Sequence, residues 1–203
     1  MPSIYNWKPR FQAALRPLTA RLAAGGVTAN QVTVLAALVS LTTGVILGCC
    51  AGYRFVLLLM PVVLFVRMAL NAIDGMLARE HAMKSRLGAI LNELGDVVSD
   101  SALYLPLALV PGFSPWLVTL IVILALMSEM AGVVSIQIGS SRRYDGPMGK
   151  SDRAFVFGFL CLLLGVGVTA GAWINVVLAG VAILLVVTIV NRCRQALREP
   201  SPA

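Results

Sequence analysis

Six ionisable side chains interrupt apolar stretches of this sequence where charge is normally absent. They are Arg67, Asp74, Glu93, Asp96, Asp100 and Glu129. Placing such a group inside a membrane span costs about 2.5–3.5 kcal/mol on insertion scales, so ionisable residues in spans normally mark a functional site. Their types indicate what that site binds, because carboxylate oxygens are the ligands that hard divalent cations prefer.

The spacing of these residues gathers them on helix faces. In one apolar stretch Gly88, Asn92, Asp96 and Asp100 recur every fourth residue, which is one face of a helix. In the preceding stretch Arg67, Asn71, Asp74 and Ala78 recur at intervals of four, three and four. Two such stripes facing each other predict a site for a divalent cation. The simpler interpretation is hydrogen bonding between helices without any ligand, but so many acidic groups together would then repel one another.

The elements that position these side chains are membrane-spanning helices. Of the 203 residues 59% are hydrophobic and 12% are charged, about half the charged fraction of a soluble domain. A span needs roughly 20 apolar residues, so we predict an all-α integral membrane protein, a bundle of six transmembrane helices with an N-terminal amphipathic interfacial helix. The predicted spans are residues 32–51, 54–79, 87–110, 114–138, 153–170 and 173–191.

Basic residues set the predicted orientation. They cluster before the first span, between the second and third, between the fourth and fifth, and after the sixth. The positive-inside rule places these segments, and both termini, in the cytoplasm, and short loops favour a bacterial inner membrane. Residues 1–26 are predicted as the interfacial segment and 27–203 as the six-span domain. The formal net charge of +7 is expected to attract membrane lipids and no nucleic acid, since aromatics are not interleaved with the basic residues.

A 26-residue segment carries a longer pattern, Asn71-x2-Asp74-Gly75-x2-Ala78-Arg79-x8-Gly88-x3-Asn92-x3-Asp96. It resembles the signature of the CDP-alcohol phosphotransferases (CDP-alcohol phosphatidyltransferases), Asp-x2-Asp-Gly-x2-Ala-Arg-x8-Gly-x3-Asp-x3-Asp, with no gap. A second segment, Val27 to Thr33, is similar to the Thr-Pro-Asn-x-x-Thr motif of that family, with Ala29 in place of proline. Thr28 before a helix is equally an N-cap.

The resemblance implies transfer of a phosphatidyl or phospho-alcohol group from a CDP-linked donor, such as CDP-diacylglycerol, to an alcohol acceptor with release of CMP. It implies Mg²⁺ or Mn²⁺ as cofactor and a homodimer. The metal ligands would be Asp74, Asn71, Asn92 and Asp96, with Asp96 also the general base. The donor-binding residues would be Gly75, Ala78, Arg79, Gly88, Thr28 and Thr33.

Asn71 and Asn92 depart from the family pattern, because aspartates occupy both positions in the signature. An asparagine keeps a carbonyl oxygen for a metal but loses the charge. Whether one ion binds or two is therefore open, as is compensation by Glu93 or Asp100 as a further ligand. Alternative functions are a catalytically impaired CDP-lipid or metal-binding homologue, a small cation transporter and a structural membrane subunit.

Other roles are also open from the sequence. Lys150 and Arg153 either hold an acceptor phosphate or serve as ordinary cytoplasmic positive charge. Arg67 pairs with Glu129 or Asp100, or contacts a phosphate. The sequence does not name the acceptor alcohol.

Overall fold

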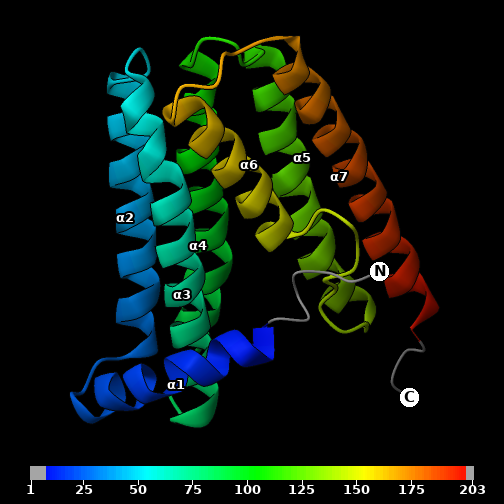
Figure 1. Ribbon diagram of the computed structural model, residues 1–203. Helices are drawn as coiled ribbons and strands as arrows, with labels where there is room; N and C mark the ends of the chain where they lie inside the picture. The colour runs from blue at the N-terminus through cyan, green and yellow to red at the C-terminus, as the bar shows by residue number, and fades with distance from the viewer. Residues whose placement is uncertain (1–7, 200–203) are drawn as a thin grey trace.

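The part of the chain that the structure describes, residues 8–199 of a computed structural model, consists of helices and their connections (Figure 1). The α-helices are α1 (Lys8–Ala24), α2 (Ala29–Cys49), α3 (Leu59–Glu80), α4 (Arg86–Tyr104), α5 (Pro115–Val134), α6 (Lys150–Gly165) and α7 (Ala172–Arg198). Short 3-10 helices precede α3 and follow α4 and α5; they are η2 (Arg54–Leu58), η3 (Leu105–Leu109) and η4 (Ser135–Ile138).

Side-chain caps fix where several of these helices begin. The hydroxyl of Thr28 accepts a hydrogen bond from the Gln31 amide and completes a capping box at the start of α2. Ser85 and Ser114 accept hydrogen bonds from amides in the first turns of α4 and α5 in the same way. Each cap satisfies an amide that has no partner within its helix, so these local signals set the start of each segment.

Four of the six predicted spans are confirmed as helices long and apolar enough to cross a membrane. They are α2, η2 with α3, α5 with η4, and α7. The chain is therefore a multi-pass membrane protein. The spans at α4 and α6 remain predictions, since α4 carries Glu93, Asp96 and Asp100 and α6 has 16 residues. At 1.5 Å per residue, α6 alone is about 24 Å long, shorter than a hydrocarbon core of about 30 Å.

The tightest helix contact joins α2 and α4. A β-carbon built on Gly44 of α2 would overlap the carbonyl oxygen of Ala102 in α4. The helices can approach this closely only because glycine has no side chain at the contact, as is common between helices in membranes. The helix α2 also packs along α3, and it therefore holds α3 and α4 at a fixed spacing.

Replacing Gly44 by alanine is therefore expected to destabilise the protein by about 1–3 kcal/mol, because the backbones of α2 and α4 must separate. Gly180→Ala in α7 is the matched control, since nothing lies within 4 Å of its would-be β-carbon. Unfolding of both variants in detergent can be followed by tryptophan fluorescence. A Gly44→Ala protein as stable as Gly180→Ala would contradict the close contact.

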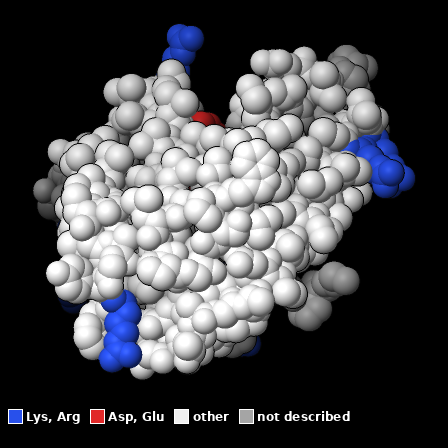
Figure 2. Space-filling model, turned by 90° about the horizontal axis from the view of Figure 1, so that it is seen from above, with Lys and Arg blue, Asp and Glu red and all other residues white. Residues whose placement is uncertain are grey.

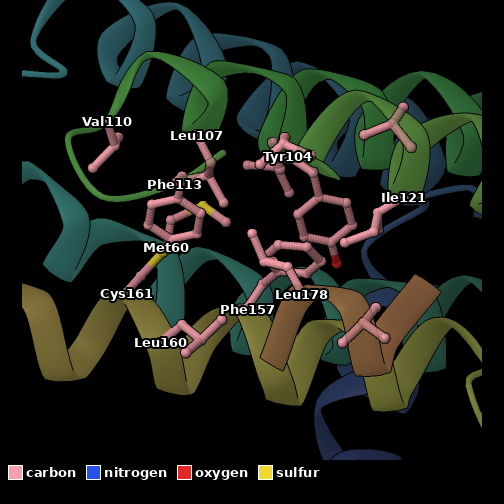
Figure 3. Close-up of a cluster of buried hydrophobic side chains, with 14 of the residues drawn as sticks. Met60, Tyr104, Leu107, Val110, Phe113, Ile121, Phe157, Leu160, Cys161 and Leu178 are labelled. Carbon is pink, nitrogen blue, oxygen red and sulfur yellow. The ribbon is translucent and has the colours of Figure 1, made fainter. Parts of the chain in front are cut away.

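The apolar core lies between α3, the end of α4 with η3, α5, α6 and α7 (Figure 3). Tyr104 and Phe157 stack at its centre, with ring centroids 4.5 Å apart. Met60 and Cys161 are also fully buried there. Large apolar side chains cover the outer faces of the bundle, including Trp116 and Val176. Apolar residues on the outside as well as the inside are expected where lipid replaces water as the solvent.

The helix α1 lies across one end of the bundle, against α3 (Figure 1). Arg16 forms a bidentate ion pair with Glu80 at 3.0 and 3.1 Å, and the rings of Phe11 and Phe65 meet edge to face. The predicted interfacial segment, residues 1–26, thus contains a helix, although residues 1–7 lie outside the described part. Its position in the membrane interface and the division at residue 26 remain predictions.

The two ends of the bundle differ in charge. Figure 2 shows the end away from α1, where white atoms predominate and most of the blue of lysine and arginine lies at the rim. The segments at the α1 end carry most of the basic residues, as the printed sequence shows. The predicted orientation in the membrane depends on this unequal distribution of basic residues between the two ends.

Candidate active site

The two polar stripes of the sequence lie on α3 and α4 and meet through their side chains. The Nδ2 atom of Asn71 in α3 lies 3.5 Å from Oδ1 of Asp96 in α4. Backbone contact between α3 and α4 is sparse, because α2 packs against both. The stripes therefore face each other as predicted, but polar side chains rather than close helix packing bridge the space between them.

The side chain of Asp74 in α3 contacts a residue of α2. The hydroxyl of Thr33 lies 2.8 Å from Oδ2 of Asp74 and can donate to it. Asp74 is only 5% exposed, so this hydrogen bond is an important source of its stabilisation. Thr33 was predicted to contact the donor, and that stays a prediction; what the structure shows is its contact with Asp74. Thr28 is the N-cap of α2. Thr28 thus has a structural role, and its predicted contact with the donor remains a prediction.

Asp96 is the most accessible of the three site aspartates, with its side chain 22% exposed. Its Oδ1 atom forms an ion pair with Nζ of Lys150, the first residue of α6. Arg67 lies 3.6 Å from the same oxygen and donates to the Asp96 carbonyl at 3.1 Å. Asp96 is therefore accompanied by two cations that belong to the chain itself.

Asp100 lies one turn further along α4, and both of its oxygens are occupied by arginines. Oδ1 pairs with Arg67, and Oδ2 pairs with Arg153 of α6 at 2.7 Å. All three side chains are almost fully buried. This geometry favours an ion-pair role for Asp100 over the predicted role as a metal ligand, because neither oxygen is left free for an ion.

Glu129 of α5 completes a wider cluster of charge. It lies within 3.3–3.5 Å of guanidinium nitrogens of Arg142, Arg153 and Arg192. Arg142 also pairs with Glu93 at 2.6 Å. Arg67 thus pairs with Asp100 and Asp96, and Glu129 pairs with other arginines. Nothing in the sequence indicated that Arg142 or Arg192 lies at the site, because both belong to basic clusters that were interpreted as ordinary cytoplasmic positive charge.

The small residues of the pattern allow close approach beside the carboxylates. A β-carbon on Gly88 would lie 2.6 Å from Oδ1 of Asn30, so glycine is needed where α4 begins against α2. The guanidinium of Arg79 folds over Gly75, where a β-carbon would come within 3.1 Å of it. Ala78 packs against a small apolar cluster between α1, α2 and α3. Arg79 is exposed and makes no ion pair within residues 8–199, so its charge is available to a ligand.

The carboxylate and amide side chains at the site are of the types that bind a divalent cation. Within residues 8–199, no three histidine, cysteine, aspartate or glutamate side chains are grouped as metal ligands. The charges of Asp96 and Lys150 lie close enough to interact with the Asp74 carboxylate. Asn71 adds an amide oxygen. Asn92 lies one turn before Asp96 and is half-buried. Two carboxylates with amide oxygens fit a Mg²⁺-like ion that takes its other ligands from phosphate and water.

A second polar cluster outside the spans ties the segment between α5 and α6 to the end of α7. Glu199 accepts hydrogen bonds from the hydroxyls of Ser140 and Ser141 at 2.7 and 2.9 Å and pairs with Arg143 at 2.7 Å. These hydrogen bonds, with one from the Ser141 amide, lower the pKa of Glu199 to about 2. They stabilise the ionised carboxylate, which is why the pKa falls.

This cluster predicts an acid-sensitive contribution to stability. Because folding lowers the pKa of Glu199 from 4.5 to about 2, its contribution is present above about pH 4.5 and is lost as pH falls through about 2. Wild type is expected to melt above Glu199→Gln at about pH 7, and the gap in Tm is expected to shrink at about pH 3. A gap that is independent of pH would contradict the role of the carboxylate.

With this geometry in place, comparison with known proteins identifies the family. The model of the CDP-alcohol phosphatidyltransferase family matches residues 26–188, and the chain belongs to that family. The resemblance seen in the sequence is thereby confirmed. The chain is a membrane-embedded member of a transferase family of phospholipid biosynthesis.

Individual relatives and solved structures agree with this membership. The chain is 46% identical over 195 residues to the inner membrane protein YnbA of Escherichia coli K12, covering 96% of each. It is 29% identical over 147 residues to the archaetidylinositol phosphate synthase of Pyrococcus horikoshii, covering 67% of this chain and 73% of that one.

The fold is that of Mycobacterium tuberculosis phosphatidylinositol phosphate synthase. The crystal structure with CDP-DAG bound matches with a TM-score of 0.73 at 21% identity, covering 91% of this chain and 94% of that one. The structure with manganese and citrate matches with a TM-score of 0.72 at 20% identity, covering 91% and 89%. At this level of identity the likeness concerns the fold alone.

Proposed function

We propose that this protein transfers the phosphatidyl group of CDP-diacylglycerol to an alcohol acceptor, with release of CMP. The observation that carries the proposal is the contact between the stripes of Asp74 and Asp96, through Asn71 and Asp96, inside the family pattern of Gly75, Ala78, Arg79 and Gly88. This geometry supports a bound pyrophosphate between a divalent ion and a base. The solved relative with CDP-DAG bound supports the same class of donor.

The reaction forms a bond between the acceptor oxygen and the β-phosphorus of the donor and breaks the bond from that phosphorus to the CMP oxygen. Asp96 would accept the proton of the acceptor hydroxyl, since it is the most accessible of the three site aspartates. Lys150 would hold the Asp96 side chain in place through their ion pair. Arg79 would contact a phosphate oxygen of the donor, and Gly75 and Gly88 would leave room for the donor to approach.

A divalent ion, Mg²⁺ or Mn²⁺, would be held by Asp74 with Asn71, Asn92 and Asp96. It would offset the negative charge that develops on the phosphate oxygens. The Thr33 hydroxyl would keep the Asp74 carboxylate aimed at the ion. The manganese in a solved structure of the same fold supports this assignment.

An apolar groove beside the site supports a lipid donor. It lies between α2 and α4, has a volume of about 190 Å³ and begins at Thr33, the residue that holds Asp74. Its walls are Val34, Ala37, Leu38, Leu91, Leu94, Gly95 and Val98. An acyl chain in this groove would place its headgroup at the polar site, so apolar contact would contribute to binding of the donor.

CMP release from CDP-dioleoylglycerol by the purified protein tests this proposal. The acceptors would include glycerol phosphate, inositol phosphate, inositol, glycerol and serine, each with Mg²⁺, with Mn²⁺ and with chelator. Metal-dependent release that requires one acceptor supports transfer and identifies the acceptor.

A second function is favoured by Asn71 and Asn92, namely a CDP-lipid binder without transferase activity. Thermal stabilisation by CDP-dioleoylglycerol without CMP release under any condition would support it over transfer. Family membership favours either function over cation transport.

We also propose that both termini face the cytoplasm of a bacterium and that the protein lies in the inner membrane as a homodimer. The name of the Escherichia coli relative supports this membrane.

Two native cysteines test the orientation. Cys49 ends α2 at the end of the bundle away from α1, Cys193 lies in the last turns of α7, and both are exposed. A membrane-impermeant maleimide is expected to label Cys49 in spheroplasts and Cys193 in inverted vesicles. Cys49→Ser and Cys193→Ser identify each signal, and the reverse pattern would contradict the orientation.

A further inference from the structure

The buried and partly buried charged side chains at the site form a set whose formal charges cancel, and the exposed Arg79 lies outside this set. The five carboxylates are Asp74, Glu93, Asp96, Asp100 and Glu129, and the five cations are Arg67, Arg142, Lys150, Arg153 and Arg192. Ion pairs join four of the carboxylates to all five of the cations. Asp74 alone is held by a neutral hydroxyl, that of Thr33.

This neutrality limits how much charge a ligand can bring. The pyrophosphate of a CDP-linked donor carries two negative charges, and one divalent cation cancels them. A second divalent cation would leave two uncompensated positive charges among buried arginines. Unpaired charge is costly where solvent is excluded. The balance of charge therefore favours one divalent cation for each bound donor.

Lys150 is fixed beside Asp96 by the structure around it. Two residues before it, the amide of Met148 donates to Thr188 of α7 at 3.0 Å. Three residues after it, Arg153 pairs with Asp100. Lys150 is also the first residue of α6, where the helix dipole opposes a positive charge. Its ion pair with Asp96 offsets that unfavourable position.

The cations of the chain are shared unequally between the two aspartates that face the proposed donor. Oδ1 of Asp96 has Lys150 in contact and Arg67 at 3.6 Å. Asp74 has a hydroxyl and the neutral Asn71 one turn away on the same face. An added cation would thus meet less competition at Asp74 than at Asp96.

We infer that this site binds a single divalent cation, for which Asp74 is the main ligand, and that the Lys150 ammonium takes the place of a second divalent cation beside Asp96. The inference rests on the proposed function, since it describes how the same site holds a CDP-linked donor. It assigns Lys150 to the positioning of Asp96, and it explains how the site accommodates Asn71 and Asn92.

Counting bound Mn²⁺ tests the inference. Equilibrium dialysis with CDP-dioleoylglycerol in detergent, with free Mn²⁺ read by electron paramagnetic resonance, is expected to give one ion per wild-type chain. The double variant Asn71→Asp with Asn92→Asp adds two negative charges and is expected to bind two. Two ions or none on wild type, or one on the folded double variant, would overturn the inference.

Lys150→Gln gives a second readout that does not depend on the double variant folding. Without donor, Mn²⁺ binding is expected to tighten by about tenfold, because a cation that competes for Asp96 is removed. Lys84→Gln, an exposed lysine in the segment between α3 and α4, is expected to bind Mn²⁺ as wild type does. Unchanged or weaker binding by Lys150→Gln would show that Lys150 does not compete with the ion.

CMP release from the same samples separates this inference from the proposed function. Two bound ions together with CMP release would overturn the single-ion site and leave the transferase standing. One bound ion with no CMP release from any acceptor would overturn the transferase and leave the single-ion site.

Discussion

CMP release is expected to fall by about a thousandfold when Asp96 is replaced by asparagine. The substitution keeps the size of the side chain and removes its ability to accept a proton. Asp96 is the most accessible of the three site aspartates, with Lys150 and Arg67 beside one oxygen. Glu93 is more exposed but is paired with Arg142, so no neighbouring carboxylate is placed to replace Asp96. Chromatographic measurement of CMP from CDP-dioleoylglycerol, with the acceptor identified by the panel, gives the rate.

Two controls separate loss of the base from loss of the fold. Asp145→Asn makes the same chemical change at a more exposed carboxylate that pairs with Arg143 and is expected to retain activity. Binding of CDP-dioleoylglycerol, measured as a rise in Tm, is expected to survive in Asp96→Asn. Full activity in Asp96→Asn would assign the base to another group and contradict the mechanism.

The largest loss of stability is expected from Asp100→Asn, at about 3–5 kcal/mol in the free energy of unfolding. The change removes the charge that pairs with both Arg67 and Arg153. Arg67 and Arg153 are 2% and 1% exposed, so water cannot take the place of the carboxylate. Breaking a buried pair from one side leaves a charge without its partner, which costs more than a missing hydrogen bond. Titration with sodium dodecyl sulfate, followed by tryptophan fluorescence, measures the difference.

Tyr104→Phe is the control at a neighbouring buried position. The Tyr104 hydroxyl is fully buried and has no hydrogen-bond partner among the described residues. Its removal leaves the stacking on Phe157 in place and is expected to change stability by less than about 1 kcal/mol. If Asp100→Asn were as mild as Tyr104→Phe, the ion pairs of Asp100 would not be a main source of stability.

Local spacing was enough to predict one part of the site. Asn71 and Asp74 share one face of α3 because side chains three residues apart on a helix lie together, and the same periodicity places Asn92 and Asp96 on one face of α4. Thr33 was found by its place in a motif, and it contacts Asp74. The apolar stretches also predicted the helices, because hydrophobic length is a property of continuous sequence.

Contacts between distant segments could not be predicted in this way. Arg192 forms an ion pair with Glu129, which lies 63 positions earlier in the sequence. No periodicity along one helix indicates which other helix it will face. Asp100 continued the polar stripe and was interpreted as a metal ligand, but α6 brings Arg153 to it. From the sequence, Lys150 was interpreted either as a ligand of an acceptor phosphate or as ordinary cytoplasmic charge. In the structure it forms an ion pair with Asp96.

The order in which the paired residues occur along the chain has a consequence for biosynthesis. A ribosome makes Arg67 before Asp100, so α3 and α4 can enter the membrane as a hairpin that already contains one buried ion pair. Arg153, the second partner of Asp100, is made 53 residues later. Until α6 is made, Arg67 is the single ion-pair partner of Asp100 among the described residues. The pairing of Asp100 is therefore complete only after α6 has been inserted, and a fragment that ends before Lys150 would leave one oxygen of this buried carboxylate without its arginine.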